Sequence, residues 1–235
     1  MKIGMFADPH YSSQYCRQVE FNRLNRLSYT KIDQAMTFFR ENGCELVICL
    51  GDLIDKDSTY ELCKENLHKI SDLIRSFGLP FICVMGNHDA FELERDEFAA
   101  ISGFPIAPCD FELDGKHFVF WDACHFKTGE HYHRGDSDWT DTELPDLHAL
   151  QESLDRSSLP TYVFLHQCLD PNIPENHRVY SSEQVRSLIH ASGKVLGVFQ
   201  GHYHPGLESV WDGIPYIALP AMCEGERNWY KIYDL

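Results

Sequence analysis

The sequence predicts a mixed α/β fold in which two β-sheets lie between outer helices. Three observations predict it. Short apolar runs alternate with amphipathic stretches in the first half of the chain, two hairpins with Asp-Gly turns occur in the second half, and two further apolar runs lie between those hairpins. Alternating strands and helices form parallel sheets covered by helices, and hairpins add antiparallel strands to them.

The first half contains three predicted strands and two predicted helices. The strands are KIGMFA (2–7), ELVICL (45–50) and PFICVM (80–85), which are rich in the Ile, Val and Phe typical of buried strands. Apolar residues at helical spacing lie between them, and each stretch ends in a glycine, Gly43 or Gly78. The first stripe comprises Phe21, Leu24, Ile32, Ala35, Met36 and Phe39; the second comprises Leu62, Ile70, Leu73, Ile74 and Phe77. We interpret both stripes as core faces.

The second half adds hairpins and one more helix. Asp114-Gly115 and Asp212-Gly213 each separate two strand-like pieces, as expected for tight hairpin turns. Residues 161–165 and 195–199 are again predicted buried strands. The helix between them begins with a possible capping box from Ser181 to Gln184 and ends at Gly193.

Length and charge limit the classes of function. The chain has 235 residues, of which 43% are hydrophobic, and this fits one large domain spanning residues 1–235. The formal net charge of -16 repels polyanions, so long nucleic acid is not an expected partner. Some of these carboxylates could instead surround divalent cations, which would neutralise them in the working protein.

Cysteine usage and the chain start predict a cytoplasmic protein. There are nine cysteines and no C-x-x-C pair, and Cys49, Cys83 and Cys124 fall in or at the end of apolar runs. Buried free thiols in a reducing compartment explain this usage. The first residues lack the apolar stretch of a signal peptide, and no segment has the length of a membrane span. We therefore expect no membrane partner.

Polar side chains follow five of the predicted strands, at the point where each strand ends. Ligands bind at the carboxyl ends of strands in open α/β sheets, and neighbouring strands lie ~5 Å apart. We therefore expect the five clusters to converge on one site. They are Asp8-Pro9-His10, Gly51-Asp52-Leu53-Ile54-Asp55, Gly86-Asn87-His88-Asp89, His166-Gln167 and Gly201-His202-Tyr203-His204.

The residue types in these clusters predict a pair of metal ions. Carboxylate, amide oxygen and imidazole suit Mn, Fe, Zn or Co. No cysteine lies inside the clusters, which argues against a structural thiolate zinc site. Two ions ~3.5–4 Å apart can hold a hydroxide between them and grip a phosphoryl oxygen. The candidate ligands are too many for one ion and suit two ions bridged by one carboxylate; they are Asp8, His10, Asp52, Asn87, His166, His202 and His204.

Taken in order, D-x-H, G-D-x-x-D, G-N-H-D, H and G-H-x-H resemble the motifs of the calcineurin-like metallophosphoesterase superfamily across nearly the whole chain. The pattern is closest to class III cyclic-nucleotide phosphodiesterase-like proteins. The resemblance implies a four-layer α/β/β/α sandwich of two mixed sheets flanked by helices. Purple acid phosphatases have a tyrosine ligand close after the bridging aspartate, where this chain has Leu53-Ile54, so we do not expect that branch.

The resemblance also implies a role for each motif residue. It assigns Asp52 to the bridge between the two ions. It assigns His88 to phosphate binding and to assistance of the leaving oxygen, and it gives Asp55 and Asp89 supporting roles, for which helix capping is an equal alternative. One ion would take Asp8, His10 and His204, and the other would take Asn87, His166 and His202.

The implied activity is hydrolysis of a small phosphodiester, of the cyclic-nucleotide or glycerophosphodiester type, by in-line attack of a metal-bridging hydroxide. The implied cofactors are two divalent or trivalent ions, Mn or Fe first and Zn or Co as alternatives. A nucleotide pyrophosphatase for ADP-ribose or CDP-alcohols and a phosphomonoesterase are alternative activities. A nuclease and a non-catalytic scaffold are further rivals, but the chain shows no basic groove and keeps His88 and every ligand position.

Residues outside the motifs suggest substrate contacts. Tyr11 and Arg17 follow the first motif, and His125 begins the polar segment 124–148. That segment, which also carries Trp139, could be a substrate loop with aromatic side chains for a nucleobase, or a solvated insertion. Residues 176–180 leave the same two possibilities open.

Overall fold

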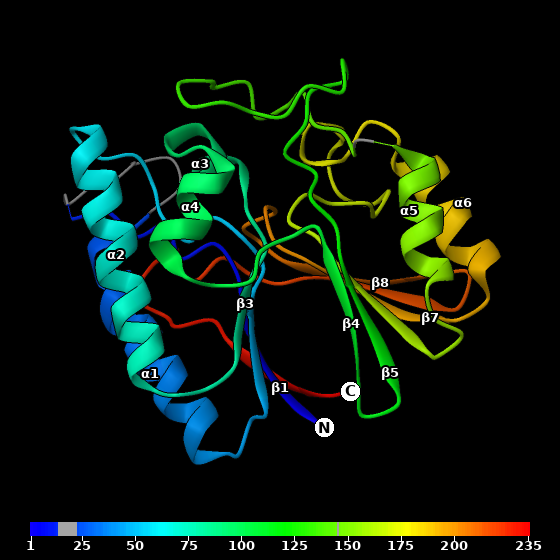
Figure 1. Ribbon diagram of the computed structural model, residues 1–235, viewed down its shortest axis with the longest axis horizontal. Helices are drawn as coiled ribbons and strands as arrows, with labels where there is room; N and C mark the ends of the chain where they lie inside the picture. Colours follow the sequence, from blue (N-terminus) through cyan, green and yellow to red (C-terminus); the bar gives the residue numbers. More distant parts are fainter. Residues whose placement is uncertain (14–22, 145) are drawn as a thin grey trace.

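Two β-sheets pack face to face in the computed structural model, which describes residues 1–13, 23–144 and 146–235. Helices α1, α2 and α4 cover the outer face of one sheet, and helices α5 and α6 cover the outer face of the other (Figure 1). The four-layer α/β/β/α sandwich predicted from the sequence is therefore confirmed.

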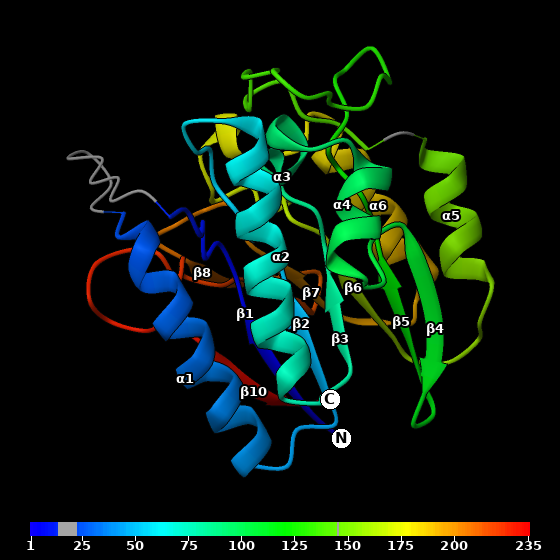
Figure 2. The same cartoon turned by 60° about the vertical axis from the view of Figure 1, so that its left-hand side comes forward.

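The first sheet has the strand order β10-β1-β2-β3. Strands β1, β2 and β3 run parallel, and β10 pairs antiparallel with β1, so the two ends of the chain share one sheet (Figure 2). The three predicted strands of the first half are present, each slightly shorter than its apolar run. The bounds are β1 (Lys2–Phe6), β2 (Leu46–Cys49), β3 (Phe81–Cys83) and β10 (Lys231–Asp234).

The second sheet has the order β4-β5-β6-β7-β9-β8, with antiparallel strands at both edges. Both predicted hairpins are present. Their turn residues have positive φ at both central positions, 49° and 70° at Asp114-Gly115 and 50° and 80° at Asp212-Gly213, which is the type I′ geometry that Asp-Gly favours. The strands are β4 (Cys109–Leu113), β5 (Lys116–Phe120), β6 (Thr161–Phe164), β7 (Val195–Gln200), β8 (Leu207–Trp211) and β9 (Ile214–Ala218).

The three predicted helices form, but one predicted cap does not. These helices are α1 (Ser28–Glu41), α2 (Tyr60–Ser76) and α6 (Ser182–Ser192); Phe21 of the first stripe lies outside the described residues. The capping box at Ser181 is wrong, because the Ser181 hydroxyl donates to Glu143 instead of accepting from the first turn of α6. Short elements that periodicity did not predict are α3 (Asn87–Glu92), α4 (Arg95–Ser102), α5 (Leu147–Asp155) and the 3₁₀ turns η1 (Asn25–Leu27) and η2 (Glu175–His177).

Apolar side chains form three layers between the four layers of backbone. Alternation along each strand separates them: Met5 of β1 points at the opposite sheet, whereas Phe6 points at the helices. The layer between the sheets is rich in aromatic rings, and Phe118, Phe120 and Phe164 stack with nearly parallel planes. Burial of these layers is the main free energy that holds the strand ends in place.

Of the nine cysteines, the eight in the described residues are free, and seven of these are buried. Buried thiols of this kind act as small apolar side chains in the core. Within the described parts of the chain, no helix combines the length and apolar character needed to cross a membrane.

A glycine in β1 sets how closely α1 approaches the first sheet, and this can be tested by substitution. A Cβ atom at Gly4 would lie 2.5–2.7 Å from ring carbons of Phe39, which is fully buried. We expect Gly4→Ala to lower the free energy of unfolding by about 1–3 kcal/mol, because the packed core cannot move the ring aside. Urea denaturation measures this change.

Gly197→Ala is the matched control, because Gly197 also lies in a strand but its Cβ would meet neighbours only at 3.5–3.6 Å. We expect its free energy of unfolding to stay within about 1 kcal/mol of the parent. Equal losses in the two variants would contradict the packing argument.

Candidate metal centre

The five polar clusters converge where the carboxyl ends of β1, β2 and β3 meet those of β6 and β7. Hydrogen bonds cross between the two sheets at this edge. His166 Nδ1 donates to the Leu50 carbonyl at 2.7 Å, and the His202 backbone N–H lies 3.0 Å from Asp8 Oδ2. Asp8, His10 and His166 have no solvent-exposed surface, and Asp52 and Asn87 have about 1%. The site is therefore a buried polar centre at the seam of the sandwich.

Asp52 occupies the middle of this centre. Its Oδ2 atom lies 3.3 Å from Nε2 of His10 and 3.3 Å from Nε2 of His166. Its Oδ1 atom accepts a 2.8 Å hydrogen bond from the His88 backbone N–H. One carboxylate oxygen is thus oriented by the backbone, and the other lies between two groups of histidines.

The first group contains Asp8, His10 and His204. The Nε2 atoms of His10 and His204 are 3.2 Å apart, and Asp8 Oδ1 lies 3.8 Å from the first and 3.7 Å from the second. Three donor atoms that face one point at these separations form a cradle for a cation.

The second group contains His166, His202 and Asn87. Ligand atoms of Asp52, His166 and His202 all lie within 4.8 Å of one another, and the rings of His166 and His202 are 5.1 Å apart. Asn87 lines the same cavity as Asp52 and His202. The two groups share Asp52, so the geometry brings together every ligand position predicted from the sequence.

Several candidate ligand atoms in the centre are buried and have no hydrogen-bond partner among the described residues: His10 Nδ1, Asn87 Oδ1, His166 Nε2 and His202 Nε2. Because His166 Nδ1 faces a carbonyl, which only accepts, that nitrogen carries the proton, and in the neutral ring Nε2 presents a lone pair. Unpartnered buried polar atoms cost free energy, and bound cations would satisfy these. The residues therefore fit a pair of metal ions.

The charges at the centre also favour the binding of cations. Burial raises the pKa of Asp8. Burial lowers the pKa of His166, but the charges of Asp52 and Asp8 outweigh this effect and raise the pKa to about 10. Burial would likewise raise the pKa of Asp52, yet the neighbouring histidines hold that pKa well below its usual range. The carboxylates thus favour positive charge beside them, and metal ions would supply it.

The backbone is bent at the ligand positions. Among the described residues, φ is positive at six non-glycine positions: two are the hairpin aspartates, and the others are Asp8 (52°), His10 (47°), Asp52 (53°) and His202 (65°). Such conformations cost free energy and gather at functional sites. The glycine before Asn87 is needed for a different reason, because a Cβ at Gly86 would lie 2.1 Å from Asp52 Oδ1.

His88 lies at the edge of the centre and is held by Asp55. Its Nδ1 is 2.8 Å from Asp55 Oδ1, and the side chain lines the cavity. Asp55 also accepts from Asn25 Nδ2 at 2.8 Å and lies 3.4 Å from Arg23. Burial lowers the pKa of His88, but the charges of Asp55 and Asp52 raise it above its usual value. Sequence reasoning missed Arg23, because it lies outside every motif.

The carboxylate of Asp89 stabilises the loops that carry the predicted ligands. This carboxylate accepts three backbone N–H groups, from Leu53 at 3.2 Å, Ile54 at 2.9 Å and Gly86 at 3.0 Å. It therefore ties the loop that carries Asp52 to the loop that carries Asn87 and His88.

Two further residues near the centre come from the loop after β9 and were not predicted. Glu224 Oε1 lies 2.7 Å from His204 Nδ1, so that Nδ1 donates to the carboxylate and Nε2 faces the centre. The buried Cys223 sulfur lies within 4.8 Å of ligand nitrogens of His10 and His204. No cysteine lies in the sequence motifs, but the fold brings this one to the site.

Two of the predicted substrate contacts, Tyr11 and His125, lie outside the cavity above the predicted ligands. Tyr11 is 3% exposed and packs against Tyr29 in the core. His125 lines a separate cavity of about 410 Å³, and Arg17 lies outside the described residues. Neither Tyr11 nor His125 lines the cavity above the predicted ligands.

That cavity has a volume of about 930 Å³. Trp139 of the segment 124–148 lines it, as do Asn176 and His177 of the segment after His166. The full lining is Arg23, Asp52, Asn87, His88, Trp139, Asn176, His177, His202, Tyr203, His204, Pro205, Pro220, Glu224 and Trp229.

Comparison with known proteins agrees with this centre. A family model described as calcineurin-like phosphoesterase matches residues 1–206. The chain is 25% identical over 196 residues to the 3′,5′-cyclic adenosine monophosphate phosphodiesterase CpdA of Haemophilus influenzae. The matched region is 77% of this chain and spans 62% of the length of that relative.

Solved structures share the fold. A dimetal phosphatase from Danio rerio superposes with a TM-score of 0.80 at 16% identity, covering 99% of this chain and 91% of its own. Purple acid phosphatase PPD1 from yellow lupin superposes with a TM-score of 0.61 at 12% identity, covering 98% of this chain and 47% of its own. At these identities the likeness establishes the fold alone.

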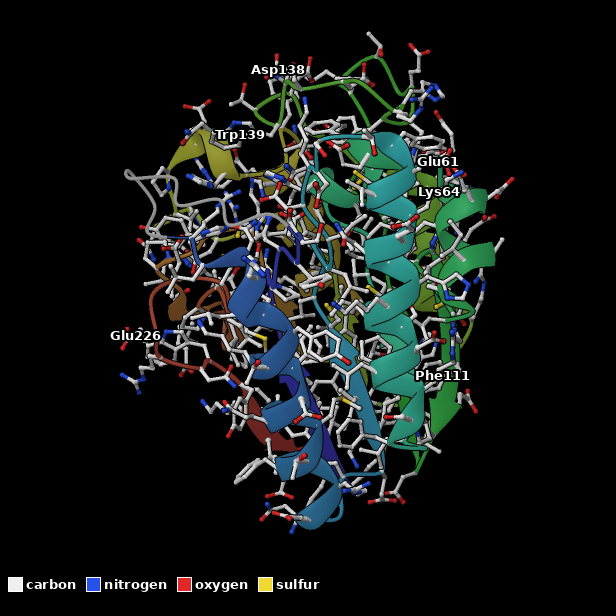
Figure 3. The ribbon with its side chains drawn as sticks, turned by 90° about the vertical axis from the view of Figure 1, so that its left-hand side faces the viewer. Glu61, Lys64, Phe111, Asp138, Trp139 and Glu226 are labelled. Atoms are coloured by element: carbon white, nitrogen blue, oxygen red, sulfur yellow. The ribbon has the colours of Figure 1, made fainter. Side chains whose placement is uncertain are left out.

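The Glu224–His204 contact predicts an effect on metal affinity. We expect Glu224→Ala to weaken Mn(II) binding about ten- to 100-fold, because a carboxylate behind a ligating imidazole orients it and increases its basicity. Competition with a chelating dye measures the affinity. Glu226→Ala is the control, since Glu226 is exposed on the same loop (Figure 3). Unchanged affinity in Glu224→Ala would show that His204 does not depend on this contact for binding metal.

Proposed function

The chain belongs to the calcineurin-like phosphoesterase family, and we propose that it is a dinuclear phosphodiesterase that hydrolyses small diesters of the cyclic-nucleotide or glycerophosphodiester type. The observation that carries the proposal is the position of Asp52, whose Oδ2 lies 3.3 Å from histidine nitrogens of both ligand groups. The likeness to a cyclic-nucleotide phosphodiesterase supports a diester substrate.

In this proposal Asp8, His10 and His204 would hold one ion, Asn87, His166 and His202 would hold the other, and both ions would share Asp52. The bound ions supply Lewis acidity, which neutralises phosphoryl oxygens and acidifies water. Nitrogen and oxygen donors suit Mn or Fe, with Zn or Co as alternatives. The eight cysteines in the described parts of the chain are free, which supports a reducing compartment such as the cytoplasm.

His88 is the proposed acid for the leaving oxygen. Its Nδ1–H donates to Asp55, which fixes the ring plane and leaves Nε2 for a substrate in the cavity. Asp55 keeps the imidazolium form favourable, so a proton is available at Nε2 when the alkoxide departs. The ring also packs edge-on against His10, with centroids 4.5 Å apart.

Arg23 is the proposed contact for a phosphate oxygen that does not react. Its guanidinium lies 3.4 Å from Asp55 and lines the cavity. The positive charge of Arg23 on the cavity wall offsets the negative charge of the nearby carboxylates and orients an anionic substrate. The net charge of -16 supports small diesters over polynucleotides.

The activity can be tested with the purified protein. We expect hydrolysis of bis(p-nitrophenyl) phosphate with Mn(II), loss of turnover after treatment with EDTA, and recovery when Mn(II) is added back. For a diester whose leaving group is an alkoxide, such as a cyclic nucleotide, His88→Ala should lower kcat by about 10²–10⁴-fold, which is the typical effect of a positioned acid. No turnover with Mn, Fe, Zn or Co would refute the proposed activity, and an intact rate with such a diester in His88→Ala would refute the role of His88.

The natural substrate class is identified by comparing turnover of cyclic nucleotides, glycerophosphodiesters, ADP-ribose and phosphomonoesters under the same conditions. We expect turnover of the diesters to exceed that of ADP-ribose and of the monoesters. Preference for ADP-ribose or for a monoester would replace the diester assignment with the corresponding alternative.

The His88–Asp55 pair predicts a change in pH dependence. If His88 acts as the protonated form, activity is lost as pH rises through its pKa, which Asp55 raises. Asp55→Asn removes that charge and should move the alkaline limb of the kcat profile to lower pH. Asp57→Asn is the control, because the side chains that donate hydrogen bonds to Asp57 in the described parts of the chain are those of Ser12, Ser13 and Asn66, and none of these is a histidine. An alkaline limb at the same pH in Asp55→Asn would rule out this assignment.

A further inference from the structure

The cavity above the predicted ligands is larger and more aromatic than a phosphate group requires. Its volume of about 930 Å³ is typical of sites for whole small molecules. Its aromatic walls come from separate parts of the chain: Trp139 from the loop after β5, His177 from η2, Tyr203 from the loop after β7, and Trp229 from the segment before β10.

Trp139 lies, together with His177, beside the ring of the predicted ligand His202, whose centroid is 5.2 Å from that of His177. The Trp139 ring centroid lies 5.6 Å from that of His202 and 4.9 Å from that of His177. Trp229, by contrast, has the Arg227 guanidinium 3.6 Å from its ring centroid, so one of its faces is already covered. A planar group attached to a phosphoester at the centre would therefore meet the wall formed by His177 and Trp139, in which the indole is the larger ring.

The loop that carries Trp139 is anchored. It arches over the seam between the two halves of the sandwich (Figures 1 and 2), with Asp138 and Trp139 on the arch in Figure 3. The buried Tyr132 donates its hydroxyl to the Asp141 carbonyl at 2.6 Å, and Thr142 Oγ1 donates to the Ala123 carbonyl at 2.7 Å. Both ends of the arch are thus held, and little ordering is left for a ligand to impose.

We propose that Trp139 is a stacking platform for a nucleobase, so that the protein selects diesters that carry a base over diesters that carry only glycerol or alkyl groups. This inference rests on the proposed phosphodiesterase function and narrows its substrate class. An indole stacks on any base because every base has a π-face, and one such contact changes affinity by about five- to 150-fold. A glycerol group has no π-face and gains nothing comparable.

Two chromogenic diesters with the same leaving group isolate this contact. They are thymidine 5′-(p-nitrophenyl phosphate) and ethyl p-nitrophenyl phosphate, which differ in the presence of a nucleoside. We expect Trp139→Ala to raise KM for the thymidine ester about five- to 150-fold with kcat nearly unchanged. The ethyl ester should keep its kcat and KM, and Trp139→Phe should retain most of the affinity for the thymidine ester.

Trp211→Ala is the matched control, since Trp211 lies on the edge strand β8 and is 38% exposed. We expect this variant to keep the KM and kcat of the parent for both esters. Equal KM changes for both esters in Trp139→Ala, or no change for either, would overturn the platform.

Binding provides a second measurement that does not depend on turnover. AMP should quench tryptophan fluorescence in the parent protein and in Trp211→Ala but much less in Trp139→Ala, and glycerol 3-phosphate should quench none of them. If neither ester is hydrolysed with any metal, the proposed function fails and this titration alone decides the role of Trp139. Equal quenching by AMP in the parent and in Trp139→Ala would overturn it.

Discussion

The rest of the centre depends on one buried carboxylate, that of Asp52. One of its oxygens accepts the His88 backbone N–H at 2.8 Å, and the other lies 3.3 Å from imidazole nitrogens on both sides. A charge buried in this way is costly unless cations or donors surround it. The histidines that approach it, and the ions that we propose between them, meet that requirement.

The two-sheet architecture makes this arrangement possible. Asp8, Asp52 and Asn87 follow three parallel strands of one sheet, whereas His166 and His202 follow two parallel strands of the other. Parallel strands place their carboxyl ends at one edge, and packing of the sheets brings the two edges together. Hydrogen bonds from His166 to Leu50 and from His202 to Asp8 then lock the seam. The apolar layers on both sides fix the distances that a pair of ions needs.

The residues at the edge of the site are positioned by different contacts from those that position its centre. Arg23, Trp139, Glu224 and Trp229 line the cavity, but they come from loops whose course depends on contacts far away in the sequence. Glu224, for example, lies on a loop that Lys31 of α1 holds through the carbonyls of Met222 and Gly225, at 2.6 and 2.7 Å. In the function that we propose, the centre provides the chemistry, and these loops shape the space that a substrate would occupy.

The sequence by itself determined the fold class, the main strands, the Asp-Gly hairpins and the strand ends from which the proposed ligands come. It could do so because strand and helix periods are local, and because side chains at successive strand ends must share one edge. Tertiary structure alone decided that Ser181 donates to Glu143, that Tyr11 is buried in the core, and that His125 lines a second cavity. It alone brought Cys223 and Glu224 to His204 and placed Trp139 over the centre. These contacts join residues far apart along the chain, and no local period encodes which loops will meet.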